Sequence, residues 1–425
     1  MDQRITIHKT TGGHSSLPTA PQSTWQAWTS SPHRVMFLLG VTQIFATMLW
    51  WMIDLAGRYG GLYDPLHWTI PPGWAHAFLM SYTVFPIFVF GFAMTALPNW
   101  TGQRLSRRVW VTAAAPLVLG IALCYTGIVL DQMIAAVGVT LILAGWLWIW
   151  QALLRLVLGN KGKDKHAVGL LVILAIGATG VALFDLSLYT GDWRYADYSR
   201  RIGLWLFLLP LFLVVSHRLI PFFSGRVIRD YVMYRPKGSL LFLAGGCIAH
   251  FVLDLNGLTM WTWLTDFPMA VWVGYLALRW GLTSSFRAKL LVMLHLSLVM
   301  LTVSLLLYSA ASFAELLGYP WILGFGPMHA LAIGYFTATT VAMVSRVSLG
   351  HSGRALEADP LTWWAFLAVL GIAVIRIASD LAFFPAGMRS ALLITAAIAW
   401  LAVFGPWGAR YAPVYLRPRA DGKPG

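Results

Sequence analysis

The chain has few charged residues. Of its 425 residues, 58% are apolar and only 11% are charged, whereas a typical soluble protein has about 25% charged residues. So little charge cannot cover the surface of a water-soluble globule. The composition therefore excludes a soluble protein and indicates a membrane protein.

Cysteine is also scarce. Cys124 and Cys247 are the only two, and both lie in apolar runs. Two cysteines exclude a disulfide scaffold and an iron–sulfur cluster held by four thiolates. The sequence has no C-x-x-C-H motif, which excludes covalent attachment of a c-type haem.

Long apolar runs recur along the whole chain, and about 20 apolar residues are enough to cross a bilayer. They predict an all-α polytopic membrane bundle with about twelve spans: 35–56, 74–97, 109–130, 133–157, 166–190, 202–220, 239–257, 260–278, 288–312, 327–349, 361–383 and 387–407.

The predicted domain organisation is one transmembrane domain over 34–410 between two tails. Residues 1–33 are polar and rich in Ser, Thr and Pro, which predicts a mobile cytoplasmic tail. Residues 411–425 form the predicted C-terminal tail. The first span is too long for the apolar region of a signal peptide, so we expect no cleaved leader.

The distribution of the 30 Lys and Arg residues predicts the orientation. In the twelve-span topology, 24 of them fall on the side of both termini, and Arg376 lies within a span. Five fall on the opposite side: Arg58, Arg194, Arg200, Arg201 and Arg389. Because Lys and Arg are enriched in cytoplasmic loops, both termini are predicted in the cytoplasm. The net charge of +14 then requires no nucleic-acid partner, and membrane lipids are the expected surroundings.

Six histidines lie in the predicted spans or at their ends. Three map toward the outer side, from three separate spans: His76, His250 and His329. Three map toward the cytoplasm: His217, His295 and His351. Titratable residues within a membrane usually mark function, so all six are candidate metal ligands. The alternative for each is a hydrogen bond between helices.

The acidic residues of the spans map mainly to the outer halves. Asp254 follows His250 by four residues, and Asp380 follows Arg376 by four, so each pair shares a helix face. The first spacing suits a carboxylate that orients a ligating imidazole. The second suits an internally neutralised pair. The outer half is therefore predicted to contain a buried cofactor or a water-filled cavity.

His76 and His329 occur in the same short pattern, H-A-x-x-x-x-Y, which ends at Tyr82 and Tyr335. Both spans run in the same direction and carry the histidine at the same depth. Two such helices are suited to present imidazoles to opposite faces of one planar macrocycle. A chance match is the alternative interpretation of so short a pattern.

Three stretches, 74–102, 217–226 and 327–354, contain more specific motifs. These are P-N-W-T-G after the second span, R-x-I-P-F-F after the sixth and S-R-x-x-L-G-H-S-G-R after the tenth. In these motifs the chain resembles the NnrS family of bacterial polytopic membrane proteins.

The resemblance implies a protein of the bacterial inner membrane that contains haem b and copper. It also implies a role in nitric oxide metabolism and protection from nitrosative stress, with nitric oxide as the small ligand. His76 and His329 are the first candidates for axial haem ligands, and His250 is the third. Whether the chain is a haem-dependent oxidoreductase, and which redox partner would serve it, is left open.

The family pattern has a second His and a Glu after the first His, where this chain has Phe78 and Leu79. A copper site that uses those residues is therefore less well supported than the haem. Arg218, Arg346 and Arg354 cluster on the cytoplasmic side, and arginine pairs well with carboxylates. They would hold the propionates of a haem that lies low in the membrane; otherwise they are positive-inside anchors.

Two other functions fit the same topology. A proton-coupled secondary transporter also commonly has twelve spans with both termini inside, and its coupling residues would be Asp185, Asp254 and Asp380. A haem or copper handling protein without enzymatic activity is the other alternative.

Overall fold

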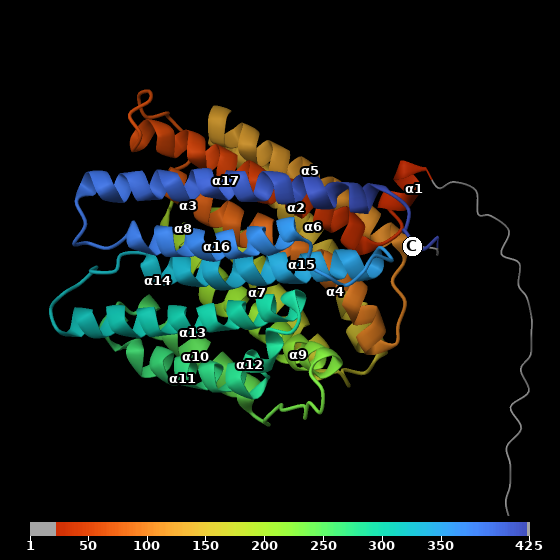
Figure 1. The fold of residues 1–425 in the computed structure, drawn as a ribbon. Coiled ribbons are helices and arrows are strands. Elements are labelled where there is room, and N and C mark those ends of the chain that lie inside the picture. The colour runs from red at the N-terminus through yellow and green to blue at the C-terminus, as the bar shows by residue number, and fades with distance from the viewer. Residues whose placement is uncertain (1–22, 423–425) are drawn as a thin grey trace, which may run out of the picture.

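The computed structural model describes residues 23–422. Over these residues the chain is helical, and the long helices pack side by side in one bundle (Figure 1). The uninterrupted long helices are α2 (Pro32–Arg58), α5 (Arg107–Leu130), α6 (Gln132–Gly159), α7 (Lys165–Thr190), α13 (Lys289–Leu316), α16 (Pro360–Ala378) and α17 (Ala386–Leu416).

Three further helices are composite, each with a π-helical segment between two α-helical pieces. The first is α3 (Pro72–Phe78), η1 (Leu79–Val84) and α4 (Phe85–Thr101). The second is α8 (Arg194–Arg201), η2 (Ile202–Leu208) and α9 (Leu209–Val227). The third is α14 (Gly326–His329), η4 (Ala330–Thr337) and α15 (Ala338–His351).

The remaining elements are shorter. Helices α10 (Ser239–Leu255) and α11 (Trp263–Arg279) are joined through the 3-10 turn η3 (Thr259–Trp261). Two very short helices complete the described chain: α1 (Thr24–Trp28) and α12 (Leu282–Ser285).

The prediction of an all-α polytopic membrane bundle is confirmed. Within residues 23–422, ten helices are long and apolar enough to cross a membrane. Each of the twelve predicted ranges overlaps a helix; the two ranges outside those ten correspond to α10 and α11, which have 17 residues each. The number of crossings and the orientation of the termini remain predictions.

Helix α1 and the C-terminal end of α17 lie at the same end of the bundle (Figure 1), which we call the terminal end. There an Arg34 guanidinium N–H donates to the carbonyl of Arg417 at 2.7 Å. The opposite end contains the turns that follow α2, α13 and α16. We call it the outer end, because the predicted orientation places it outside the cytoplasm.

Both predicted tails are longer than the structure supports. Residues 1–22 lie outside the described part. Ser23 caps α1: its hydroxyl accepts a hydrogen bond from the backbone N–H of Gln26, and the side-chain oxygen of Gln26 accepts one from the backbone N–H of Ser23. Helix α17 continues past 410 to Leu416, and Tyr411 and Tyr415 are buried. The tail boundaries at 33 and 411 are therefore corrected: the helical bundle begins earlier and ends later.

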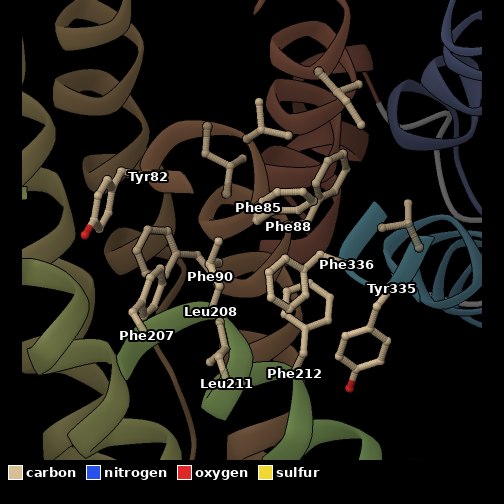
Figure 2. Packing of buried hydrophobic residues seen from close by; sticks show 14 of the residues in the cluster. Tyr82, Phe85, Phe88, Phe90, Phe207, Leu208, Leu211, Phe212, Tyr335 and Phe336 are labelled. Carbon is tan, nitrogen blue, oxygen red and sulfur yellow. The ribbon is translucent and has the colours of Figure 1, made fainter. Parts of the chain in front are cut away.

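The three composite helices occupy the centre of the bundle. Their most apolar windows are 72–83% buried, against 33–61% for the other candidate spans. Aromatic side chains from all three meet there, including Phe85, Phe212 and Phe336 (Figure 2). The hydroxyl of Tyr82 donates to the carbonyl of Ser199 at 2.7 Å, where Gly180 leaves room that a Cβ would fill. The two helices with the H-A-x-x-x-x-Y pattern are therefore central elements.

Candidate functional site

The described residues line a partly open cavity of about 850 Å³ at the outer end. Its walls come from α2, the three composite helices, α16 and α17. Phe85 and Phe336 of the central aromatic core also line this cavity. The cavity therefore begins where the packed core ends.

His76 and His329 both line this cavity, from α3 and α14. Each lies close to a π-helical segment: His329 directly precedes η4, and η1 begins three residues after His76. Such segments inside α-helices are frequent at functional sites. The structure thus brings together the two histidines that share the sequence pattern.

The imidazole of His76 has few polar contacts. Its ring stacks on Trp51, with 4.2 Å between ring centroids and 17° between planes. Its Nδ1 is buried and has no hydrogen-bond partner among the described residues. Buried polar atoms are usually hydrogen-bonded, so this ring has coordination capacity that residues 23–422 do not use.

The imidazole of His329 is held from one side. Its Nδ1 lies 3.0 Å from the carbonyl oxygen of Phe325 and 3.4 Å from a carboxylate oxygen of Asp380. An N–H at Nδ1 donates to these acceptors, which leaves the lone pair on Nε2. Asp380 also pairs with Arg376 at 2.6 Å, so the predicted neighbours Asp380 and Arg376 do lie beside a candidate ligand.

His250 does not line the cavity. Its Nδ1 lies 2.8 and 3.0 Å from the two carboxylate oxygens of Asp266 on α11. Its ring stacks on Trp205 with centroids 3.4 Å apart. The predicted pairing with Asp254 is wrong, because Asp254 forms an ion pair with Arg201 instead. A shared helix face was not enough to bring the two side chains together.

The other three candidate histidines lie apart from the cavity and from each other. His217 Nδ1 is 3.2 Å from His166 Nε2, and His295 Nε2 is 3.1 Å from the hydroxyl oxygen of Ser224. The ring of His351 lies 4.8 Å from that of His33. Within residues 23–422, no group of three or more His, Cys, Asp or Glu residues comes together as a metal site.

Arg218, Arg346 and Arg354, which were predicted to hold the propionates of a haem low in the membrane or else to be positive-inside anchors, are not among the residues that line the cavity. Arg346 lies over the ring of Phe223 at 3.9 Å. Arg218 lies 3.9 Å from the ring centre of Trp100, and its guanidinium donates to Asp164 at 2.7 and 2.9 Å.

Asp164 lies before α7, outside the membrane-spanning segments. Burial raises the pKa of its carboxyl. Hydrogen bonds from the Ala167 N–H and from Arg218 outweigh that effect, and the pKa lies below its ordinary value. The Arg218 guanidinium is therefore already neutralised by this carboxylate.

Four other arginines line the cavity: Arg58, Arg200, Arg376 and Arg389. Three of them, Arg58, Arg200 and Arg389, are among the five arginines that lie against the positive-inside bias in the predicted topology. Their position on the outer side was the sequence feature that could have identified them, because an arginine that opposes the positive-inside bias is expected to have a specific structural or functional role. Neither the depth of the histidines nor the family motifs pointed to Arg58, Arg200 or Arg389.

Comparisons with known proteins agree with this architecture. The family model described as NnrS protein matches residues 27–419. A search of curated protein sequences gives no match. Seven chains of solved structures match, among them a haem-copper terminal oxidase dimer determined by cryo-electron microscopy. It shares 10% identity at a TM-score of 0.65, over 92% of this chain and 86% of the oxidase chain. At this identity the likeness shows a common fold.

Proposed function

Because the match over residues 27–419 shows that the chain belongs to the NnrS family, we propose that it is a haem-binding protein of the bacterial inner membrane that acts in nitric oxide metabolism. One observation carries the proposal: His76 and His329, from two separate central helices, line the same cavity. These two residues would hold the iron of a b-type haem.

The free atoms of the two imidazoles fit this role. His76 has a buried nitrogen without a partner among residues 23–422. The contact of His329 Nδ1 with the Phe325 carbonyl fixes the tautomer and leaves Nε2 as the ligating atom. Metal-bound histidines typically have such an acceptor on the other ring nitrogen.

The cavity also fits in size and character. Its volume of about 850 Å³ lies within the 300–1,000 Å³ that is common for cofactor and small-molecule sites, which are mostly apolar with a few placed polar groups. Large aromatic side chains line it, including Trp51, Trp74 and Trp400. These side chains give the cavity wall a largely apolar surface for a planar macrocycle.

Haem iron, when bound, supplies electron transfer or the binding of a small gas. The residues of this chain contribute position and polarity. Asp380, held by Arg376 at 2.6 Å, orients His329. An uncharged gas such as nitric oxide enters through apolar surroundings without a charged path, which suits this buried site.

The proposal does not extend to copper. Within residues 23–422, no three His, Cys, Asp or Glu side chains come together as a candidate metal site. Where the resemblance implies a second His and a Glu, this chain has Phe78 and Leu79. The metal site proposed here consists of His76 and His329 alone.

The test is an absorption spectrum of the full-length protein, purified in detergent, in oxidised and reduced forms. We expect a Soret band that is lost or shifted in His76→Ala and in His329→Ala. His351→Ala, at the terminal end, is the matched control and should keep the wild-type spectrum. A haem spectrum unchanged in both cavity variants would reject these ligands. A colourless wild-type protein that carries out proton-coupled uptake would support the transporter alternative instead.

A further inference from the structure

The four cavity arginines differ in how their charge is compensated. Arg58 forms an ion pair with Asp54, Arg200 with Asp197 at 2.7 Å and Arg376 with Asp380 at 2.6 Å. Each of these carboxylates lies three or four residues away on the same helix or at its end.

Arg389 is the exception. It lies in the first turns of α17 and lines the cavity, and it has no carboxylate partner among the described residues. Its Nε atom is buried and also has no hydrogen-bond partner there. A guanidinium carries five N–H donors and stays protonated, and a buried donor without an acceptor is unfavourable. The structure therefore contains an uncompensated cation at the wall of the cavity.

We propose that Arg389 binds an acidic side group of the molecule that occupies the cavity. This inference rests on the proposed function: the occupant is a b-type haem, and the acidic groups are its propionates. Guanidinium and carboxylate form strong, charge-assisted hydrogen bonds in a fixed geometry. Four guanidinium groups and three partner carboxylates leave one positive charge at the cavity wall, and that charge lies on Arg389.

The same reasoning separates Arg389 from the other arginines. Arg58, Arg200 and Arg376 have an internal carboxylate and do not need the occupant to be neutralised. The family-motif arginine Arg218 is neutralised by Asp164 at the other end of the bundle. Arg389 is thus a positioning residue that would bind the acidic side groups of the haem, while His76 and His329 would hold its iron.

The first experiment measures transfer of haem from the purified holoprotein to an excess of a haem-accepting apoglobin. Loss of a hydrogen bond between charged groups predicts transfer about 10- to 100-fold faster for Arg389→Gln than for wild type. Arg389→Lys should recover part of the loss, because it restores the charge without the bidentate geometry. Arg410→Gln is the matched control on the same helix, since Arg410 pairs with Asp359 at 2.7 Å and does not line the cavity.

The second experiment shows whether the propionates are the groups that are bound. Full-length protein, produced without haem, is titrated with haemin and with haemin dimethyl ester. Wild type should prefer haemin by about tenfold or more, and Arg389→Gln should lose this preference. The inference would be overturned if Arg389→Gln preferred haemin over its dimethyl ester as strongly as wild type does, or if it transferred haem at the wild-type rate. Either result would leave the proposed histidine ligands unaffected. If wild type binds neither compound, the proposed function fails with it.

Discussion

His329 and His250 form an informative comparison. Both are buried, with 9% and 4% of the residue surface exposed. Each lies beside an aspartate from another element, Asp380 or Asp266. His329 nevertheless lines a cavity of about 850 Å³, whereas His250 is covered by Trp205 and contacted edge-on by Tyr308.

The hydrogen bonds of the two histidines also differ. Asp266 accepts from His250 with both carboxylate oxygens, and that carboxylate is fully buried. Asp380 is shared between His329 and Arg376, and the nearer acceptor of His329 is the backbone carbonyl of Phe325. A histidine with a carboxylate neighbour is thus not by itself a metal site. The cavity that His329 lines and His250 does not is what separates the two.

The largest expected effect comes from the same substitution at both histidines. His329→Gln should abolish the Soret band of the purified protein, because an amide does not replace an imidazole as an axial ligand. His250→Gln should keep it, because the glutamine amide still donates to Asp266 and no cofactor ligand is removed. The measurement is the ratio of Soret to protein absorbance. If His250→Gln bleaches the protein and His329→Gln does not, the two roles are reversed.

The next effect concerns the two aspartates. Removal of a carboxylate behind a metal-bound histidine typically costs 10- to 100-fold in metal affinity. Asp380→Asn should therefore lose haem about 10- to 100-fold faster to an acceptor globin, while Asp266→Asn should match wild type. Equal rates for Asp380→Asn and wild type would show that the Phe325 carbonyl alone orients His329.

For stability we expect the opposite order, with a larger effect of the substitution at Asp266 than of the substitution at Asp380. Asp266 is fully buried and accepts two contacts from His250. Asp266→Asn turns an acceptor into a donor there and should lower the free energy of unfolding by about 1–3 kcal/mol. Thermal unfolding in detergent measures the change. The control Asp192→Asn removes an exposed pair with Arg194 and should leave the unfolding midpoint where it is; an equal shift in both variants would contradict a structural role of the buried pair.

Much of the fold was predictable from the sequence, because apolar runs of membrane length leave few alternatives. Each predicted range overlaps a helix of the structure. The π-helical segments were not predictable, since they depend on how the central helices pack. The continuation of α17 to Leu416 was missed because buried Tyr411 and Tyr415 were assigned to the C-terminal tail.

The site was predictable in part. Depth and direction of the spans placed His76 and His329 at one level, and both line the cavity. The same reasoning added His250, because depth along a helix does not say which neighbour its face contacts. Spacing along one helix also favoured Asp254, while the actual partner, Asp266, comes from the next helix. The charge of Arg389 was counted by side of the membrane, which hides whether a carboxylate compensates it.

The smallest expected effect is at the terminal end, where Arg218 had been a candidate for holding haem. Arg218→Gln should leave the haem content unchanged and lower stability at pH 7 by at most about 1 kcal/mol from the ion pair, because solvent screens it. The pKa of Asp164 is held below its ordinary value of 3.8. The stabilisation is therefore present above that value and is lost as the pH falls through the lowered pKa in the folded protein.

The difference in unfolding midpoint between wild type and Arg218→Gln should accordingly shrink from pH 7 to about pH 3. The part of this midpoint difference that persists at low pH measures the contribution of the packing of Arg218 on Trp100. A difference that grows on acidification would contradict the assigned pairing with Asp164. Loss of haem in this variant would place a carboxylate of the cofactor at the terminal end, and would transfer to Arg218 the role inferred for Arg389.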